Sequence, residues 1–173
     1  MNHAEIGRPE AGEYAEYYER YVSRVPEENL VAALESDRAD MLSRLRSIPP
    51  GRSGHRYAPG KWSIREVVQH VVDTERVFGF RAFWFARRSG SPLPSFDQDE
   101  AMKSVPAAAV LADLISELDH LRKSHILFFQ ALEPEAWTHS GVASGNPFSV
   151  RALAAIIAGH SRHHAAILQE RYL

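Results

Sequence analysis

The sequence predicts an all-α protein built as a four-helix bundle. Four long segments repeat apolar residues with the 3.6-residue period of a helix, whereas the alternation typical of strands is nearly absent. Turn residues gather between these segments rather than inside them. The 173 residues fit one domain, 1–173, with an N-terminal arm over 1–25, and they are enough to bury a single core without a disulfide.

The first long helix is expected over about 26–47, because its apolar residues form one stripe and Pro49-Pro50-Gly51 ends the pattern. The arm before it contains EYAEYYERY, residues 13–21, which is compatible with a short helix.

The second long helix has the clearest start in the chain. In KWSIREVVQH, Ser63 and Glu66 form an S-x-x-E capping box, in which each side chain bonds to the backbone of the other residue. The helix is expected to reach about Arg88, with Trp62 packed over its start. Three prolines and a glycine then interrupt residues 89–106, which predicts a long crossover loop.

Two further helices complete the bundle. The third spans about 107–132, and the fourth runs from Val150 to about Glu170 with Ser149 as its N-cap. The long crossover between helices two and three allows these two helices to run parallel.

Composition argues against several classes of function. The 20 Lys and Arg residues against 22 Asp and Glu leave a net charge of −2 without a long block of one sign, so neither nucleic acid nor an anionic membrane is favoured. We expect a small-molecule substrate and a homodimer. Because there is no cysteine, any thiol has to come from outside. The chain has neither a signal-peptide pattern nor a run of 18 apolar residues, which predicts a cytoplasmic protein.

Three histidines crowd the fourth helix in GHSRHHAAIL, residues 159–168. Each residue advances about 100° around the helix axis, and we take Leu153 as the zero of this angle. His160 and His164 then lie near −20° and +20°, in the apolar stripe, whereas His163 lies at its margin near −80°. Two facing buried imidazoles cost free energy, and a shared divalent cation would remove that cost. The H-x-x-x-H spacing recurs at metal sites, although hydrogen bonds to another helix are an alternative.

A third ligand has to come from another helix, and His70 is the leading candidate. Periodicity from Ile64 places it on a flank of the second helix, near −120°, as expected for a solvent-side or interhelix histidine. Glu66 and Asp73 lie four residues before and three after it and are candidates to support its ring. Glu75 falls in the apolar stripe instead, as a competing ligand or as the buried partner of an arginine.

The remaining polar candidates are interpreted more simply. The segment FDQDE carries Asp97, Asp99 and Glu100, which either approach the mouth of a site or keep the crossover in solvent and cap the next segment; we prefer the second. Four histidines match no ligand spacing and are expected at the surface or in local bonds: His55, His120, His125 and His139.

Three segments together resemble the DinB and YfiT-like superfamily, in particular its DinB-like domain proteins. They are KWSIREVVQHVVDTERVFGFRA, LPSFDQDE and SVRALAAIIAGHSRHHAAILQERY, and the resemblance runs from about residue 14 to the C-terminus. It implies an up-down-down-up bundle, often a homodimer, with zinc or nickel held by His70, His160 and His164. His163 stays outside this set. Three protein ligands leave an open coordination position, which is typical of a reactive site.

Characterised relatives in this superfamily include transferases and isomerases that use small thiols such as bacillithiol or mycothiol. The resemblance therefore implies an S-transferase that joins an exogenous low-molecular-weight thiol to a small electrophile, with the metal lowering the pKa of the sulfur. One alternative is a metal-dependent hydrolase, for which Glu66, Asp73 and Glu75 are the candidate bases. Another is a metal-stabilised dimeric binding or stress-response module. The aromatic run at 78–85 is a candidate dimer face for it, although we prefer core packing as the explanation for most of these residues.

Overall fold

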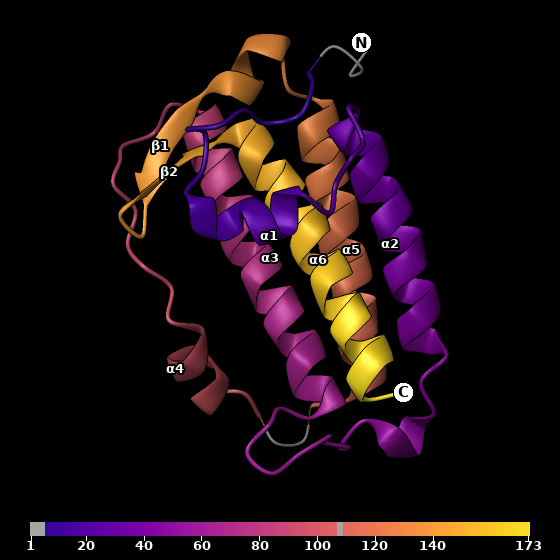
Figure 1. Ribbon diagram of the computed structural model, residues 1–173. Helices are drawn as coiled ribbons and strands as arrows, with labels where there is room; N and C mark the ends of the chain where they lie inside the picture. Colours follow the sequence, from indigo (N-terminus) through magenta and orange to yellow (C-terminus); the bar gives the residue numbers. More distant parts are fainter. Residues whose placement is uncertain (1–5, 107–108) are drawn as a thin grey trace.

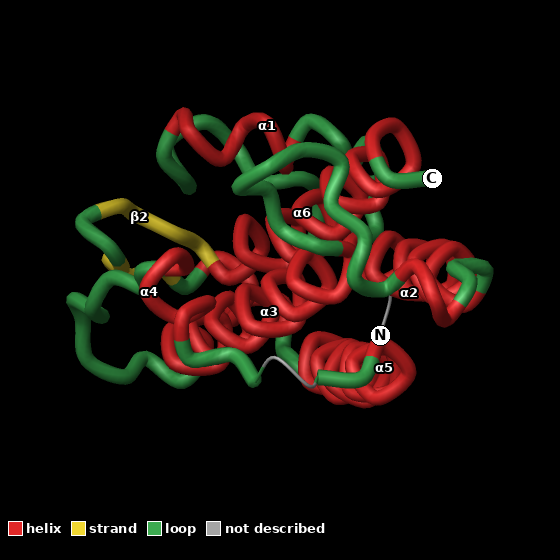
Figure 2. Tube along the Cα trace, turned by 90° about the horizontal axis from the view of Figure 1, so that it is seen from below, coloured by secondary structure: helices red, strands yellow, loops and turns green. Residues whose placement is uncertain are grey.

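Four long helices run along one another in the computed structural model, which describes residues 6–106 and 109–173 (Figure 1). They are α2 (Leu30–Arg46), α3 (Ile64–Ala86), α5 (Leu111–Gln130) and α6 (Val150–Arg171). Helices α2 and α6 point one way and α3 and α5 the other, so the predicted bundle with parallel second and third helices is confirmed. Both α2 and α3 pack against α5 and α6, as the view along the bundle shows (Figure 2).

Two of these helices begin where the sequence marks a cap. At the start of α3, Glu66 Oε2 accepts the backbone N–H of Ser63 at 2.6 Å, while the Ser63 hydroxyl accepts the N–H of Glu66, which completes the capping box. At the start of α6, the hydroxyl of Ser149 accepts the N–H of Ala152 at 3.0 Å.

The other two helices begin later than expected. Helix α2 starts at Leu30 rather than near residue 26, because Asn29 forms the N-cap and its side chain accepts the N–H of Ala32 at 3.0 Å. Helix α5 starts at Leu111 rather than near 107, with Val110 in extended conformation at the cap. Residues 107–108 of the predicted start lie outside the described residues.

A β-hairpin that the sequence pattern did not predict joins α5 to α6. Strand β1 (Ser140–Ala143) pairs antiparallel with β2 (Asn146–Ser149). Ser144 and Gly145 between them have positive φ values of 52° and 73°, as a two-residue type I′ turn requires. Each strand has only four residues and the hairpin contains Gly and Pro, so no alternation was long enough to be recognised.

The crossover is not a continuous loop, because it contains the short helix α4 (Gln98–Lys103). The carboxylate of Asp97 caps it by accepting the N–H groups of Asp99 and Glu100, both at 3.0 Å. All three acidic side chains are exposed, in agreement with the preferred interpretation of FDQDE.

The N-terminal arm forms the predicted short helix. A 3₁₀ turn over Glu16–Tyr18 leads into α1 (Glu19–Val22), which crosses the outer side of α6 (Figure 2). The two elements approach so closely that a Cβ on Gly159 would lie 2.0 Å from the carbonyl oxygen of Tyr21. Glycine at this position therefore brings the arm against α6, one residue from His160.

Two apolar clusters fill the bundle, rather than the single core expected. The cluster at the hairpin end contains Phe85, Phe129 and Trp137, and the cluster at the opposite end is built around Ile64 and Leu45. Each long helix carries a buried polar side chain between the two clusters: Asp37, Glu75, Arg122 and His160. A polar layer thus crosses the middle of the bundle.

An ion-pair cluster forms the main part of this layer. Arg122 donates from Nε and Nη2 to the two carboxylate oxygens of Glu75, at 2.7 and 2.9 Å, and from Nη1 to Asp37 at 2.5 Å. The three side chains are at most 3 % exposed. Burial by itself would lower the pKa of Arg122, but Glu75 and Asp37 raise it above its ordinary value, so the guanidinium stays charged. Arg122 thereby ties α5 to both α2 and α3.

The aromatic run of α3 divides between core and surface. Phe78 and Phe85 are buried, whereas Phe80 and Phe83 are exposed, and a homodimer through this exposed pair stays a prediction. Among the described residues, no helix is long and apolar enough to span a membrane.

The substitution Arg122→Met should lower the free energy of unfolding by about 3–5 kcal/mol, because it leaves two buried carboxylates without their cation. Urea denaturation followed by circular dichroism measures this loss. The neighbouring, half-exposed Lys123→Met is the matched control and should change stability by less than about 0.5 kcal/mol. Adding Glu75→Gln and Asp37→Asn to Arg122→Met should restore part of the loss. An Arg122→Met variant as stable as the parent would contradict the role given to this cluster.

Candidate metal centre

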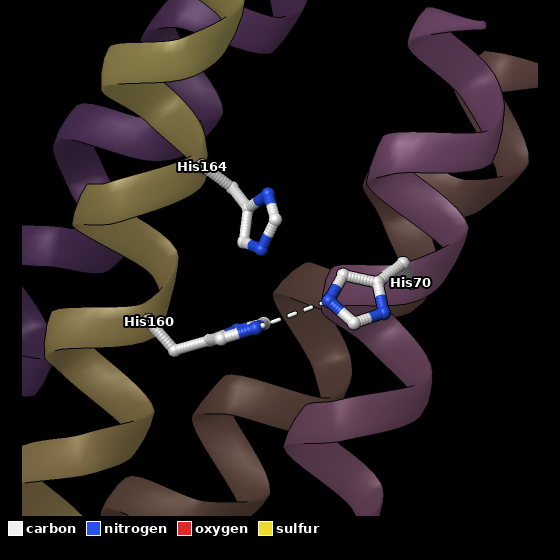
Figure 3. Close-up of side chains that lie close together, drawn as sticks. All are labelled: His70, His160 and His164. Carbon is white, nitrogen blue, oxygen red and sulfur yellow. Dashed lines mark hydrogen bonds between the residues drawn. The ribbon is translucent and has the colours of Figure 1, made fainter. Parts of the chain in front are cut away.

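Three imidazole rings from two helices converge in the polar layer (Figure 3). His70 comes from α3, and His160 and His164 come from successive turns of α6. Nε2 of His70 lies 3.1 Å from Nε2 of His160, and each of the three side chains offers one nitrogen within 4.8 Å of the others. The structure therefore brings together the three histidines that the sequence singled out.

His70 is buried, with 4 % of its surface exposed, and does not lie on a solvent flank. Of the two positions that periodicity left open, solvent-side and interhelix, the structure shows the second. Helix α3 packs against α5 on one side and α6 on the other, so that a wider arc of the helix is covered than one stripe. The ring of Trp62 lies 5.0 Å from that of His70. Trp62 thus covers the start of α3, as expected, and also closes one side of the histidine group.

Burial keeps the three rings neutral. It lowers the pKa of His70 from 6.5 to about 4 and that of His164 to about 3, with smaller contributions from neighbouring histidines. The pKa of His160 lies well below 6.5, again mainly through burial. Neutral imidazoles are the form that binds a metal, so these rings need not lose a proton to do so at neutral pH.

Thr74 contacts Nδ1 of His160, the ring nitrogen that does not face His70. Its hydroxyl donates to the backbone carbonyl of His70 at 2.5 Å, and Nδ1 of His160 lies 3.5 Å from the same hydroxyl oxygen. Because the hydroxyl proton is used in that bond, the oxygen is free to accept a hydrogen bond from Nδ1–H of His160. This arrangement favours the tautomer with a free lone pair on Nε2, the nitrogen that faces His70.

The spacing of the histidine nitrogens suits a metal ion. Figure 3 shows one ring nitrogen of His164 facing His70 and His160. Two imidazole nitrogens that bind one zinc ion at about 2.1 Å in a tetrahedron lie roughly 3.4 Å apart, close to the 3.1 Å between His70 and His160. The donor set is purely imidazole, because no carboxylate of the described residues joins the group.

The acidic residues proposed as bases all have other partners. Glu66 bonds to Ser63 and Arg56, and Asp73 accepts from Gln69, so the expected support of the His70 ring by these two residues is not found. Glu75 is the buried partner of Arg122, which decides between the two roles that the sequence left open.

The other histidines also lie outside the group. His120 and His139 approach backbone carbonyls through Nδ1, at 2.7 and 3.1 Å, and His125 lies 3.3 Å from Glu75. His163, half-buried, packs against Tyr21 and His164.

Sequence reasoning missed Thr74 and Tyr21. Thr74 lies four residues after His70 and therefore shares its helix face, a spacing that could have identified it. Tyr21, whose ring lies 5.1 Å from that of His160, belongs to the arm, and no periodicity relates it to α6.

A cavity of about 240 Å³ opens beside His160, between the arm, α3 and the crossover. A larger one of about 620 Å³ lies between the C-terminal part of α2 and the start of α5, and none of the three histidines lines it. Of these two cavities, the smaller one gives access to the histidine group.

Sequence comparison relates most of the chain to one family. The model of the DinB superfamily matches residues 33–168. A protein from Bacillus mycoides strain KBAB4, named as a candidate metal-dependent hydrolase, is 25% identical over 152 residues, which cover 84% of this chain and 87% of the relative. A protein with the same kind of name from Geobacillus kaustophilus strain HTA426 is 24% identical over 146 residues, 79% of this chain and 78% of the relative.

Two solved structures share the fold. YfiT from Bacillus subtilis, described as a probable metal-dependent hydrolase with an unusual four-helix bundle topology, has a TM-score of 0.69 at 17% identity and covers 82% of each chain. A variant of the mycothiol-dependent maleylpyruvate isomerase has a TM-score of 0.69 at 13% identity, over 84% of this chain and 61% of the other. With a family match over most of its length and a bundle of this topology, the chain belongs to the DinB superfamily.

Proposed function

We propose that His70, His160 and His164 bind a divalent metal ion, zinc or nickel, and that the protein is a metal-dependent enzyme that transfers an exogenous low-molecular-weight thiol to a small electrophile. The observation that carries this proposal is the convergence of three neutral imidazoles at one point of the bundle. Imidazole suits both metals, and three protein ligands leave room for a reactant.

When bound, the metal would supply a Lewis acid that lowers the pKa of a thiol or a water molecule. The residues of the chain supply the position and the surroundings. Thr74 holds the tautomer of His160, and Trp62 and Tyr21 cover the rings, which reduces contact with bulk water.

No described residue contributes a free carboxylate to the histidine group, and this supports a thiol rather than water as the nucleophile. Hydrolysis requires a group that takes a proton from water and passes it to the leaving group. Glu66, Asp73 and Glu75 are engaged elsewhere. A thiol, with an ordinary pKa of about 8.5, ionises far more readily than water. The fold shared with a mycothiol-dependent enzyme adds support.

Hydrolysis is the second candidate, because both curated relatives and YfiT carry names of metal-dependent hydrolases. For this reaction, His163 is a candidate base, since its ring packs against that of His164.

Replacement of a ligand should remove the metal. His70→Ala, His160→Ala and His164→Ala should each lower zinc affinity at least about 100-fold, because loss of a group that merely orients a ligand already costs roughly 10–100-fold. Metal content after dialysis, measured by mass spectrometry, tests this. His120→Ala, an exposed histidine on α5, is the control and should keep its metal. Full metal content in all three ligand variants would refute the site.

The lowered pKa values predict that the metal-free protein loses stability in acid. Unfolded histidines take up protons below about pH 6.5, whereas folded His70 does so only near its pKa of about 4. Between about pH 7.5 and pH 5 this residue alone should therefore lower the free energy of unfolding by about 2 kcal/mol. Urea unfolding at both pH values, after chelation, measures it. His70→Gln should reduce the pH-dependent loss by that amount, and an unchanged loss would show that His70 is protonated normally.

Turnover should require added thiol. Zinc- or nickel-loaded protein should consume 1-chloro-2,4-dinitrobenzene with a small thiol faster than the uncatalysed reaction, and His160→Ala should abolish the difference. The matched assay without thiol uses 4-nitrophenyl acetate. Metal-dependent ester cleavage in place of thiol transfer would favour the hydrolase. Inactivity in both assays, together with a loss of stability on metal removal, would favour the non-catalytic module.

A further inference from the structure

Two arginines are buried in the described part of the chain, and they differ in their partners. Arg122 has two carboxylates, whereas Arg81, which is 4 % exposed, makes no ion pair with any described residue. Arg81 donates from Nη2 to the hydroxyl of Ser144 at 2.8 Å and to the carbonyl of Pro94 at 3.3 Å. The Tyr18 hydroxyl also interacts with Arg81, and all three of these partners are neutral. The charge of Arg81 is therefore buried without a counter-charge from any described residue.

The surroundings hold this guanidinium in one place. Its central carbon lies 5.9 Å from the ring centre of Phe78 and 5.8 Å from that of Phe148. Its hydrogen bonds reach the hairpin turn at Ser144 and the crossover at Pro94, which fixes it from two further segments. Aromatic rings and neutral acceptors attract a cation but do not neutralise it.

Arg81 and His160 line the same cavity of about 240 Å³. Its other polar groups include Tyr18, Tyr21 and Gln98, and none of the described residues that line it is acidic. Burial raises the pKa of both tyrosines above 10, so their hydroxyls stay protonated and can donate hydrogen bonds. His160, which adjoins His70 and His164, thus lines one side of the cavity, and the buried cation of Arg81 lines another.

We propose that this cavity binds the carboxylate of a small organic acid next to the three histidines, and that Arg81 is its counter-charge and the residue that determines substrate specificity. The planar guanidinium is suited to a carboxylate, with which it forms paired charge-assisted hydrogen bonds. Phe78 and Phe96 in the lining favour an acid with a flat apolar body. Reaction of that acid rests on the proposed function, whereas its binding to Arg81 does not.

Benzoate and benzamide test the proposal, since they have nearly the same shape and only benzoate is charged. Binding to the metal-free full-length protein is measured by isothermal titration or by ligand-observed NMR. Benzoate should bind at least about 10-fold more tightly than benzamide, because only its carboxylate pairs with the guanidinium. Arg81→Gln should weaken benzoate by a similar factor and leave benzamide unchanged, and Arg81→Lys should keep part of the preference. Arg76→Gln, an exposed arginine of the same helix, should behave like the parent.

Equal binding of the two probes, or benzoate binding that Arg81→Gln does not weaken in a variant with native circular dichroism, would overturn the proposal. If Arg81→Gln does not fold, Arg81→Lys decides, because a purely structural cation would leave the preference for benzoate unchanged. If the protein binds no metal, the proposed function is wrong, but the benzoate result is unaffected because it is measured on the metal-free protein. Failure of the proposed function and failure of the carboxylate pocket can therefore be distinguished.

The carboxylate can belong to the electrophile or to the thiol. Binding of 3-mercaptopropionate and 2-mercaptoethanol to the zinc-loaded protein separates these sources. If Arg81→Gln weakens only the charged thiol, the thiol carries the carboxylate. If it weakens neither thiol and still weakens benzoate, the electrophile carries it. Either result supports the carboxylate pocket.

Discussion

The ion pairs of Arg122 with Glu75 and Asp37 fix how the helices are turned relative to one another. Glu75 has to face α5 to reach Arg122, and this sets the rotation of α3 about its axis. His70, five residues earlier, then points about 140° away from Glu75, toward α6. The interhelical ion pair therefore helps to aim the histidine of α3 at the two histidines of α6. This polar layer also divides the apolar core into two clusters, because it interrupts apolar packing on all four helices.

The same layer explains why three imidazoles can remain buried. Each ring is held neutral by desolvation, and the nearby acidic groups of the layer are already paired with Arg122, so none is left to charge the histidines. Neutral rings with converging nitrogens form a pre-organised donor set, in which little has to move when a cation enters. The bundle thus supplies ligands in the protonation state that metal binding requires.

The cavity beside the histidines is built mainly from segments outside the four long helices. Tyr18 and Tyr21 come from the arm, Phe96 and Gln98 from the crossover, and Ser144 from the hairpin turn. Helices provide the candidate metal ligands and Arg81, whereas the connections enclose the space in which a substrate would lie. Such connections vary more readily than the packed helices, which allows bundles of the same architecture to serve different substrates.

Spacing along a single helix predicts the helical class, the capping box at Ser63, the cap at Ser149 and the pairing of His160 with His164, so these features could be read from the amino-acid sequence alone. The sequence also identified His70 by its type, but periodicity left open whether this ring faces solvent or a neighbouring helix. Three-dimensional packing was needed to show that Glu75 pairs with Arg122, that Thr74 and Tyr21 adjoin His160, and that Arg81 lies buried without a carboxylate from any described residue. These contacts join residues from different elements. They depend on the rotation of each helix about its axis, which is set by ion pairs and packing with neighbouring helices and not by any local pattern.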